Sequence, residues 1–424
     1  MPNFIARPQR FLNPLKRPRL YAARARLSKL LTGRQAADLD VLSKRIILPS
    51  LPSADEDMTR LSIIENGRRL ARQDRWDDFS SLIRLADDAR LSTPGGCAEA
   101  ILLVLGAHGD VVAAAEDALN DGRAPGGDGL AALDEVAHDA PESYPCALVS
   151  AMAHLQVARA WRITKSAAQA GDPVTHARRH CTAARDRLAE FDAMRAETPS
   201  LATAACMLAE RSGDAPARII GAHMHLIRLD PRNLLNMRKF GRLLLPRASG
   251  NFELLDDHAT RLAAQTQDIW GNGAYVWVWI DALKVDPAGL GHVDAQRFTD
   301  GLHDILCDTA NQHVVNDLAA FCARAMAPEH TGPLSRPAEK SRARLHACQD
   351  WIFARHLHEL HPCLWSEVDQ TASAFRKAPA HRALVTQGRK AALRVIAQRF
   401  ADQMADGSSI AFSPAGMYRL PANC

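Results

Sequence analysis

Long apolar runs are missing from this 424-residue chain. The longest, at residues 101–105 and 274–280, fall far short of the roughly 20 apolar residues that a membrane-spanning helix needs. The N-terminus also lacks the continuous apolar segment of a secretory signal. We therefore expect a cytoplasmic protein with no transmembrane segment.

Paired cysteine motifs are absent as well. The nine cysteines are odd in number, none forms a C-x-x-C motif, and several, such as Cys206, lie within apolar helical patterns. This usage is typical of buried free thiols and excludes a disulfide framework, so it indicates a reducing compartment.

Acidic residues are missing from residues 1–34, which carry nine basic side chains. Without this segment the chain has 43 basic and 48 acidic residues, so a mildly acidic body follows a basic N-terminal arm. The arm has three interpretations: a solvated flexible arm, a docking segment for an acidic surface, and a contact to nucleic acid or a membrane surface.

Recognisable enzyme motifs are also lacking. The sequence contains no G-x-S-x-G, no G-x-x-x-x-G-K-[ST] and no G-x-G-x-x-G after a strand. Adjacent carboxylates such as Asp256 and Asp257 point in different directions on a helix. These absences favour a binding protein over an enzyme, although they leave catalysis open, and they indicate no cofactor.

Helix-forming residues are abundant instead. Aromatic residues make up only 5% of the chain, and alanine, leucine and arginine dominate. Apolar residues recur at helical spacing, for example at Val314, Leu318 and Phe321, and short Gly/Pro-rich breaks separate the periodic segments. We therefore predict an all-α protein of stacked helical hairpins, an α-solenoid.

Two loose segments, 121–130 and 329–340, suggest domain boundaries. We predict five regions in chain order. They are a basic N-terminal arm at 1–34, an N-terminal helical region at 35–122, a central helical-repeat region at 131–329, a C-terminal helical region at 341–404, and an extended tail at 405–424.

Two resemblances accompany this pattern. The stretch 217–233, ARIIGAHMHLIRLDPRN, resembles the closing helix of a tetratricopeptide repeat, although the signature of the first repeat helix is absent. The segment from Asn233 to Ile280 resembles bacterial helical proteins of unknown function that carry an L-L-P-R-x-x-G turn, here from Leu244 to Gly250. These resemblances imply a tetratricopeptide-like helical protein and no particular activity.

Histidine and cysteine, the ligands that zinc prefers, cluster between His346 and Cys363. On a helix His358 and His361 would share a face, with Cys363 just beyond them. These three residues are weak metal-ligand candidates. A metal-dependent enzyme using this region is one alternative function, and a nucleic-acid-associated regulator acting through residues 1–34 is another.

An aromatic cluster is the remaining feature. Residues Trp270, Tyr275, Trp277 and Trp279 either pack in a core or face a partner, and Arg247 lies in the nearby turn. We treat all five as partner-binding candidates. Stacked hairpins form long concave surfaces, so the sequence favours a scaffold or adaptor that binds a protein or peptide.

Overall fold

Helices form most of the computed structural model, which describes residues 38–52, 55–191, 197–248, 250–367 and 380–422. The all-α class is therefore confirmed at the level of secondary structure. No helix in these ranges is long and apolar enough to span a bilayer. The predicted basic arm at 1–34 lies outside the described residues.

The first group of helices follows residue 54 and runs as far as Ser212. It comprises α2 (Asp55–Arg72), α3 (Trp76–Asp88), α4 (Glu99–Ala107), α5 (Gly109–Asn120), α6 (Asp128–Asp139), α7 (Tyr144–Ile163), α8 (Ala167–Ala170), α9 (Pro173–Leu188) and α11 (Pro199–Ser212). Their apolar faces form one hydrophobic core centred on α7, which is buried along nearly its whole length.

The second group begins at Pro216. It comprises α12 (Pro216–Leu229), α13 (Leu234–Leu243), α14 (Phe252–Gln265), α15 (Gln267–Trp270), α16 (Gly273–Val285), the short η1 (Pro287–Gly291), α17 (Ala295–Asp308), α18 (Gln312–Ala320), the π-helical η2 (Phe321–Ala325), α19 (Pro328–Thr331), α20 (Arg336–Ala347), α21 (Gln349–Arg355), α22 (Pro362–Glu367), α23 (His381–Arg399) and η3 (Asp402–Met404). Their larger core surrounds α16.

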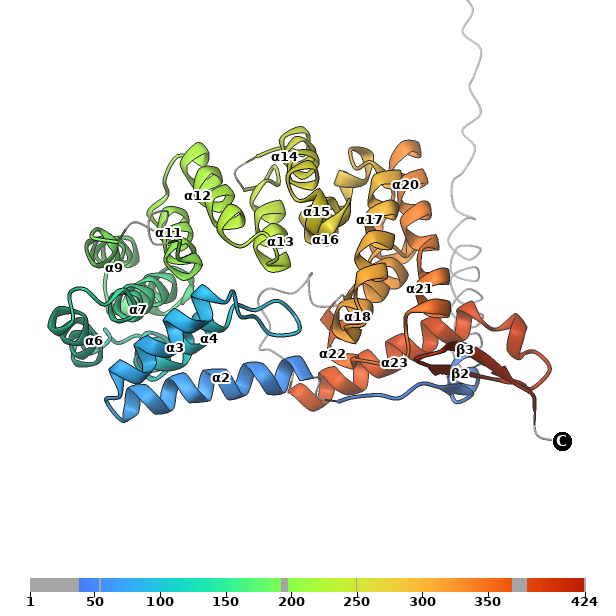
Figure 1. Ribbon diagram of the computed structural model, residues 1–424, viewed down its shortest axis with the longest axis horizontal. Helices are drawn as coiled ribbons and strands as arrows, with labels where there is room; N and C mark the ends of the chain where they lie inside the picture. The colour runs from blue at the N-terminus through green and yellow to red at the C-terminus, as the bar shows by residue number, and fades with distance from the viewer. Residues whose placement is uncertain (1–37, 53–54, 192–196, 249, 368–379, 423–424) are drawn as a thin grey trace, which may run out of the picture.

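These helices form an arch that α2, α22 and α23 close along its lower side (Figure 1). We call this arrangement the helical ring. Helices that are close in sequence pack together around it, as α7 with α9, α11 with α12, and α13 with α16 do. Only a small hydrophobic cluster links α11 to α12, where one core gives way to the other.

One core therefore gives way to the other near residue 213. Residues 121–127 do form a loop, but much of 329–340 is helical. Helix α20 begins within it because Ser335 caps the helix, accepting a hydrogen bond from the backbone N–H of Ala338, and Pro337 fits the first turn.

The C-terminal tail is non-helical, as predicted, but it does not simply run along the surface. It folds into an antiparallel hairpin of β2 (Ser409–Ser413) and β3 (Gly416–Leu420). Strand β2 also pairs in parallel with β1 (Ile46–Ile47). Gly416 lies at the turn with φ of +116°, a conformation that favours glycine.

His108, between α4 and α5, is fully buried. Burial lowers the pKa of this imidazole to about 4, so the folded chain keeps it neutral down to that pH. The unfolded chain takes up the proton already below about pH 6.5. The neutral imidazole therefore contributes to the free energy of unfolding above pH 6.5, and this contribution is lost as the pH falls toward 4.

We expect His108→Met to flatten this acid-side loss. Between about pH 6 and pH 4.5, the free energy of unfolding of the variant should fall less steeply with decreasing pH than that of the unchanged chain. The two slopes should differ by up to about 1.4 kcal/mol per pH unit. Urea unfolding at several pH values measures the slope, which is independent of the offset that the new side chain adds. An unchanged slope would contradict the prediction.

Candidate functional site

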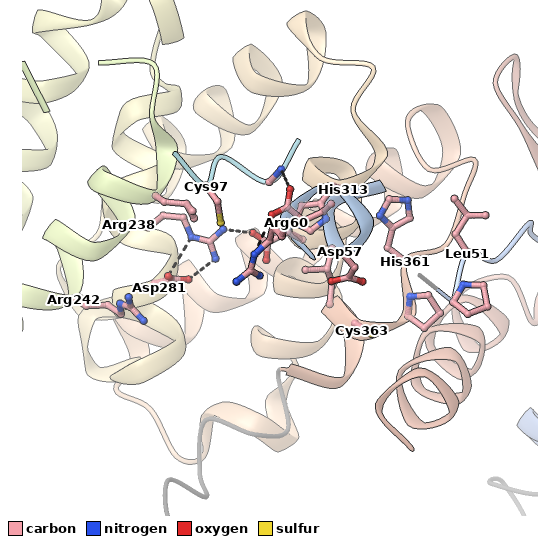
Figure 2. Close-up of a pocket in the computed structure, with 17 residues that line it drawn as sticks. Leu51, Asp57, Arg60, Cys97, Arg238, Arg242, Asp281, His313, His361 and Cys363 are labelled. Atoms are coloured by element: carbon pink, nitrogen blue, oxygen red, sulfur yellow. Dashed lines mark hydrogen bonds and ion pairs between the residues drawn. The ribbon is translucent and has the colours of Figure 1, made fainter. Parts of the chain in front are cut away.

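A polar pocket of about 300 Å³ lies where the ends of the helical ring meet. We call it the central pocket (Figure 2). Its walls come from the beginning of α2, the loop at residues 92–98 (the inner loop), α13, α16, α18 and α22. The lining residues are Leu51, Pro52, Glu56, Asp57, Arg60, Gly95, Cys97, Leu235, Arg238, Arg242, Asp281, His313, Asp317, His361, Pro362, Cys363 and Leu364.

Glu56 ties the inner loop to α2. Its buried carboxylate accepts hydrogen bonds from the backbone N–H of Gly95 at 2.5 Å and from Thr93 Oγ1 at 2.9 Å. Arg60 Nε lies 3.8 Å from the same carboxylate.

A buried charge network forms the wall opposite α2. The Arg238 guanidinium on α13 donates to both carboxylate oxygens of Asp281, at 2.8 and 3.2 Å, and to Asp317 at 2.6 Å. Lys284 lies 3.0 Å from Asp317 and 3.6 Å from Asp281. Burial acts to raise the pKa of Asp317, but Arg238 and Lys284 outweigh it and hold that pKa well below its usual value.

Two histidines line the side of the pocket next to α22. The rings of His313 and His361 meet edge to face, with their centroids 5.9 Å apart. Burial lowers the pKa of His313 from its ordinary value, so this imidazole is neutral near pH 7. His361 Nε2 is 2.8 Å from Glu359 Oε1, which orients the ring.

The two pocket cysteines have different surroundings. Burial is the largest effect on Cys97 and raises the pKa of its thiol, which disfavours the nucleophilic thiolate. Cys363 Sγ lies 3.9 Å from His381 Nδ1. The pocket therefore presents fixed charges and hydrogen-bonding groups beside these two thiols.

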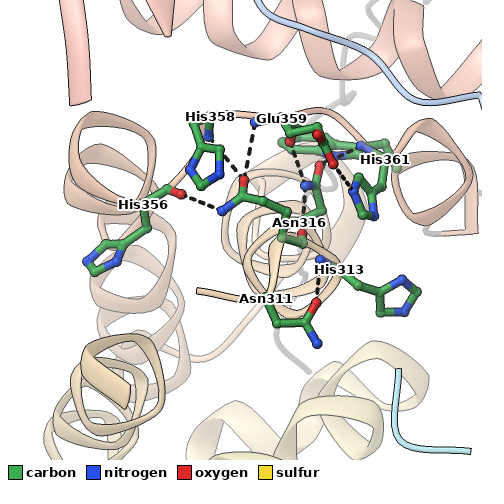
Figure 3. A network of polar contacts seen from close by, with 9 residues as sticks. Asn311, His313, Asn316, His356, His358, Glu359 and His361 are labelled. Carbon is green, nitrogen blue, oxygen red and sulfur yellow. Dashed lines mark hydrogen bonds and ion pairs between the residues drawn. The ribbon is translucent and has the colours of Figure 1, made fainter. Parts of the chain in front are cut away.

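The predicted histidine helix does not form. Residues 356–361 form a non-helical segment between α21 and α22 (Figure 3). Leu360 of this segment forms a bridge with Ser50. Two amides of α18 hold this backbone. Gln312 Oε1 accepts from His358 N and Glu359 N, at 3.1 and 3.2 Å, and Asn316 Oδ1 accepts from His361 N at 3.0 Å.

This correction removes the shared helical face proposed for His358 and His361. His361 and Cys363 line the central pocket, whereas His358 does not. Among the described residues, no group of three or more His, Cys, Asp or Glu side chains is placed to hold a metal ion.

The aromatic candidates are placed mostly in the core. Tyr275, Trp277 and Trp279 lie on α16 and are at most 1% exposed, so in this conformation they cannot contact a partner. Trp270 is partly buried, and its Nε1 donates to Pro231 O at 2.8 Å. Arg247 is exposed in the turn after α13 and does not line the central pocket.

A second cavity of about 340 Å³ lies across the inner loop from the central pocket. Thr93, Pro94 and Gly96 of the loop contribute to it, with Trp270 and Trp277. Asn311 Nδ2 donates to Pro94 O at 2.6 Å and anchors the loop to the second group of helices. The inner loop therefore separates two cavities at the junction of the two hydrophobic cores.

Sequence reasoning missed most of the central pocket. Its charged residues lie on α2, α13, α16 and α18, which are far apart in the sequence. One local signal was present: Asp281 and Lys284 interrupt the apolar sequence of α16, whose other residues from Gly273 to Leu283 are all buried. Charged residues within so buried a helix require partners, and this requirement points to a site.

Comparison with known proteins identified no relative of this chain. No protein-family model matches the chain, and neither a curated protein nor a solved structure is significantly similar to it.

Proposed function

We propose that this chain is a peptide-binding protein and that the central pocket receives a short segment of a partner protein. The observation that carries the proposal is the convergence of charged side chains from α2, α13, α16 and α18 on one open cavity. Pockets of this kind occur preferentially where structural units meet, and here the two hydrophobic cores meet.

The pocket is organised before a ligand arrives. The Glu56 carboxylate is fixed by the inner loop, and Arg238 is fixed by two carboxylates. Fixed groups lose little conformational freedom on binding, so more of their interaction energy contributes to affinity. A volume of about 300 Å³ is at the lower end for ligand pockets, which suits a short segment of a longer peptide.

The wider architecture supports the same function. Sequential packing of neighbouring helices around the ring is what a solenoid of the tetratricopeptide type would produce, and such stacks commonly present an inner surface to peptides. None of the cysteines in the described residues forms a disulfide, which supports an intracellular site of action as part of this proposal.

Selection from a displayed library of random linear peptides tests the proposal. Enriched peptides would be synthesised with a fluorescein label, and their affinity measured by fluorescence polarisation. Arg242→Trp should weaken binding at least tenfold because the indole occupies the pocket. The fold should tolerate this change, since Arg242 is exposed and has no ionic partner among the described residues.

The matched control is Arg389→Trp. Arg389 is an exposed arginine on α23 that does not line the pocket, so this change should alter affinity less than twofold. The proposal is wrong if no peptide is enriched over an unrelated helical protein, or if both variants bind the enriched peptides as the unchanged chain does.

A further inference from the structure

Two charged side chains of opposite sign in the central pocket have no partner among the described residues. Three of the other charged groups lining it, Arg238, Asp281 and Asp317, form one network that Lys284 completes. Glu56 is matched by Arg60 and by two hydrogen bonds. Within the described residues, the side chains of Arg242 and Asp57 have neither a salt bridge nor a hydrogen bond.

Arg242 lies one helical turn after Arg238 on α13, so both side chains face the pocket. The neighbouring carboxylate, Asp281, is already engaged by both Arg238 and Lys284. The Arg242 guanidinium is therefore available to a ligand. Its planar N–H groups suit two parallel hydrogen bonds to a carboxylate.

Asp57 lies on the other side of the pocket, toward Cys363 (Figure 2). It is in the first turn of α2, where the helix dipole favours its negative charge. It acts electrostatically on His313, but burial keeps that imidazole neutral near pH 7, so the two do not form an ion pair. A cationic group entering the pocket would have Asp57 available as its counter-charge.

We infer that the peptide segment bound in the central pocket carries one acidic and one basic side chain, the acidic group on Arg242 and the basic group on Asp57. The inference rests on the proposed peptide-binding function and specifies its ligand. A ligand of one charge sign would leave one of the two protein charges facing a partly desolvated pocket without a partner, which costs binding energy.

A defined peptide set tests this. Each fluorescein-labelled probe is acetylated and amidated and contains one glutamate and one arginine, in either order, separated by zero to three glycines. Neutral counterparts replace glutamate with glutamine or arginine with citrulline. We expect the unchanged chain to bind the best dipolar probe at least tenfold more tightly than either neutral counterpart in fluorescence polarisation.

Single-charge variants then assign each contact. Arg242→Gln should abolish the preference for glutamate over glutamine and keep the preference for arginine over citrulline. Asp57→Asn should do the reverse. The reciprocal exchange, Arg242→Asp with Asp57→Arg, should restore binding to a probe of the opposite charge order.

The failures are distinguishable. In one outcome, library-selected peptides bind and Arg242→Trp abolishes their binding, but the preferences for glutamate and arginine are absent or persist in both single-charge variants. The dipolar ligand is then wrong, while the proposed peptide binding stands. If Asp57→Asn lowers only thermal stability, Asp57 serves the helix terminus and the inference is overturned. If no library peptide and no probe binds, the proposed function itself fails.

Discussion

Replacing Trp279 with alanine is expected to lower the free energy of unfolding by about 3–5 kcal/mol. The indole is fully buried on α16, stacks on Phe252 with the ring centroids 6.4 Å apart, and donates from Nε1 to Asp256 at 3.3 Å. Truncation removes the apolar contacts of the largest type of side chain and leaves a cavity that a closely packed core cannot fill. Urea unfolding followed by circular dichroism measures the loss.

Trp270→Ala is the matched control. This tryptophan is only partly buried at the second cavity, so its truncation should cost clearly less than that of Trp279. Equal losses, or a Trp279 variant as stable as the unchanged chain, would show that burial on α16 does not stabilise the fold as described.

Replacing Arg238 with methionine should destabilise the chain by about 3–5 kcal/mol. Asp281 and Asp317 would keep only Lys284 as a cationic partner, in surroundings where an uncompensated carboxylate is costly. Burial is the largest single effect on Asp281 and acts to raise its pKa, but Arg238 and Lys284 lower it overall. Removing Arg238 should therefore raise the pKa of this carboxyl group.

The native network stabilises the fold above the unfolded-state pKa of aspartate, about 3.9, and this contribution is lost as the pH falls below that value. The Arg238 variant should thus differ most from the unchanged chain near neutral pH. Adding Asp317→Asn to it should recover part of the stability, because only one buried carboxylate then shares Lys284.

Arg261→Met provides the comparison for this second prediction. Arg261 pairs with Asp257 on the exposed side of α14, and its loss should cost less than about 1 kcal/mol. An Arg238 variant as mildly affected as the Arg261 variant would contradict the role of the network.

The helical class was predictable because it depends on local properties. Alanine- and leucine-rich segments with helical periodicity, separated by glycine and proline, specify helices wherever they pack. The non-helical conformation of 356–361 was not predictable in this way. Its backbone is held by hydrogen bonds to Gln312 and Asn316, which lie more than 40 residues earlier in the chain. A local sequence pattern does not indicate hydrogen bonds over such a separation.

The site was less predictable than the fold. The aromatic residues attracted attention because they are rare, but rarity says little about exposure, and three of them fill the core. The pocket depends on tertiary proximity, as when Glu56 meets Gly95 and Arg238 meets Asp317. A single sequence contains almost no information about such contacts between residues that are far apart in the chain.

The pairing of β1 with β2 also has a consequence for biosynthesis. Ile46 aligns with Ile410, so β1 can pair only after all the helices between it and β2 have been synthesised. The segment around β1 is further tied to the C-terminal elements through Asp40 with Arg394, and Pro49 with Leu360. During synthesis the helices from α2 to α11 can pack on the ribosome as they emerge, but residues 38–52 stay without their native neighbours until the last helix and hairpin are released. A nascent chain stalled before residue 380 should accordingly leave this segment open to protease while the first hydrophobic core is already protected.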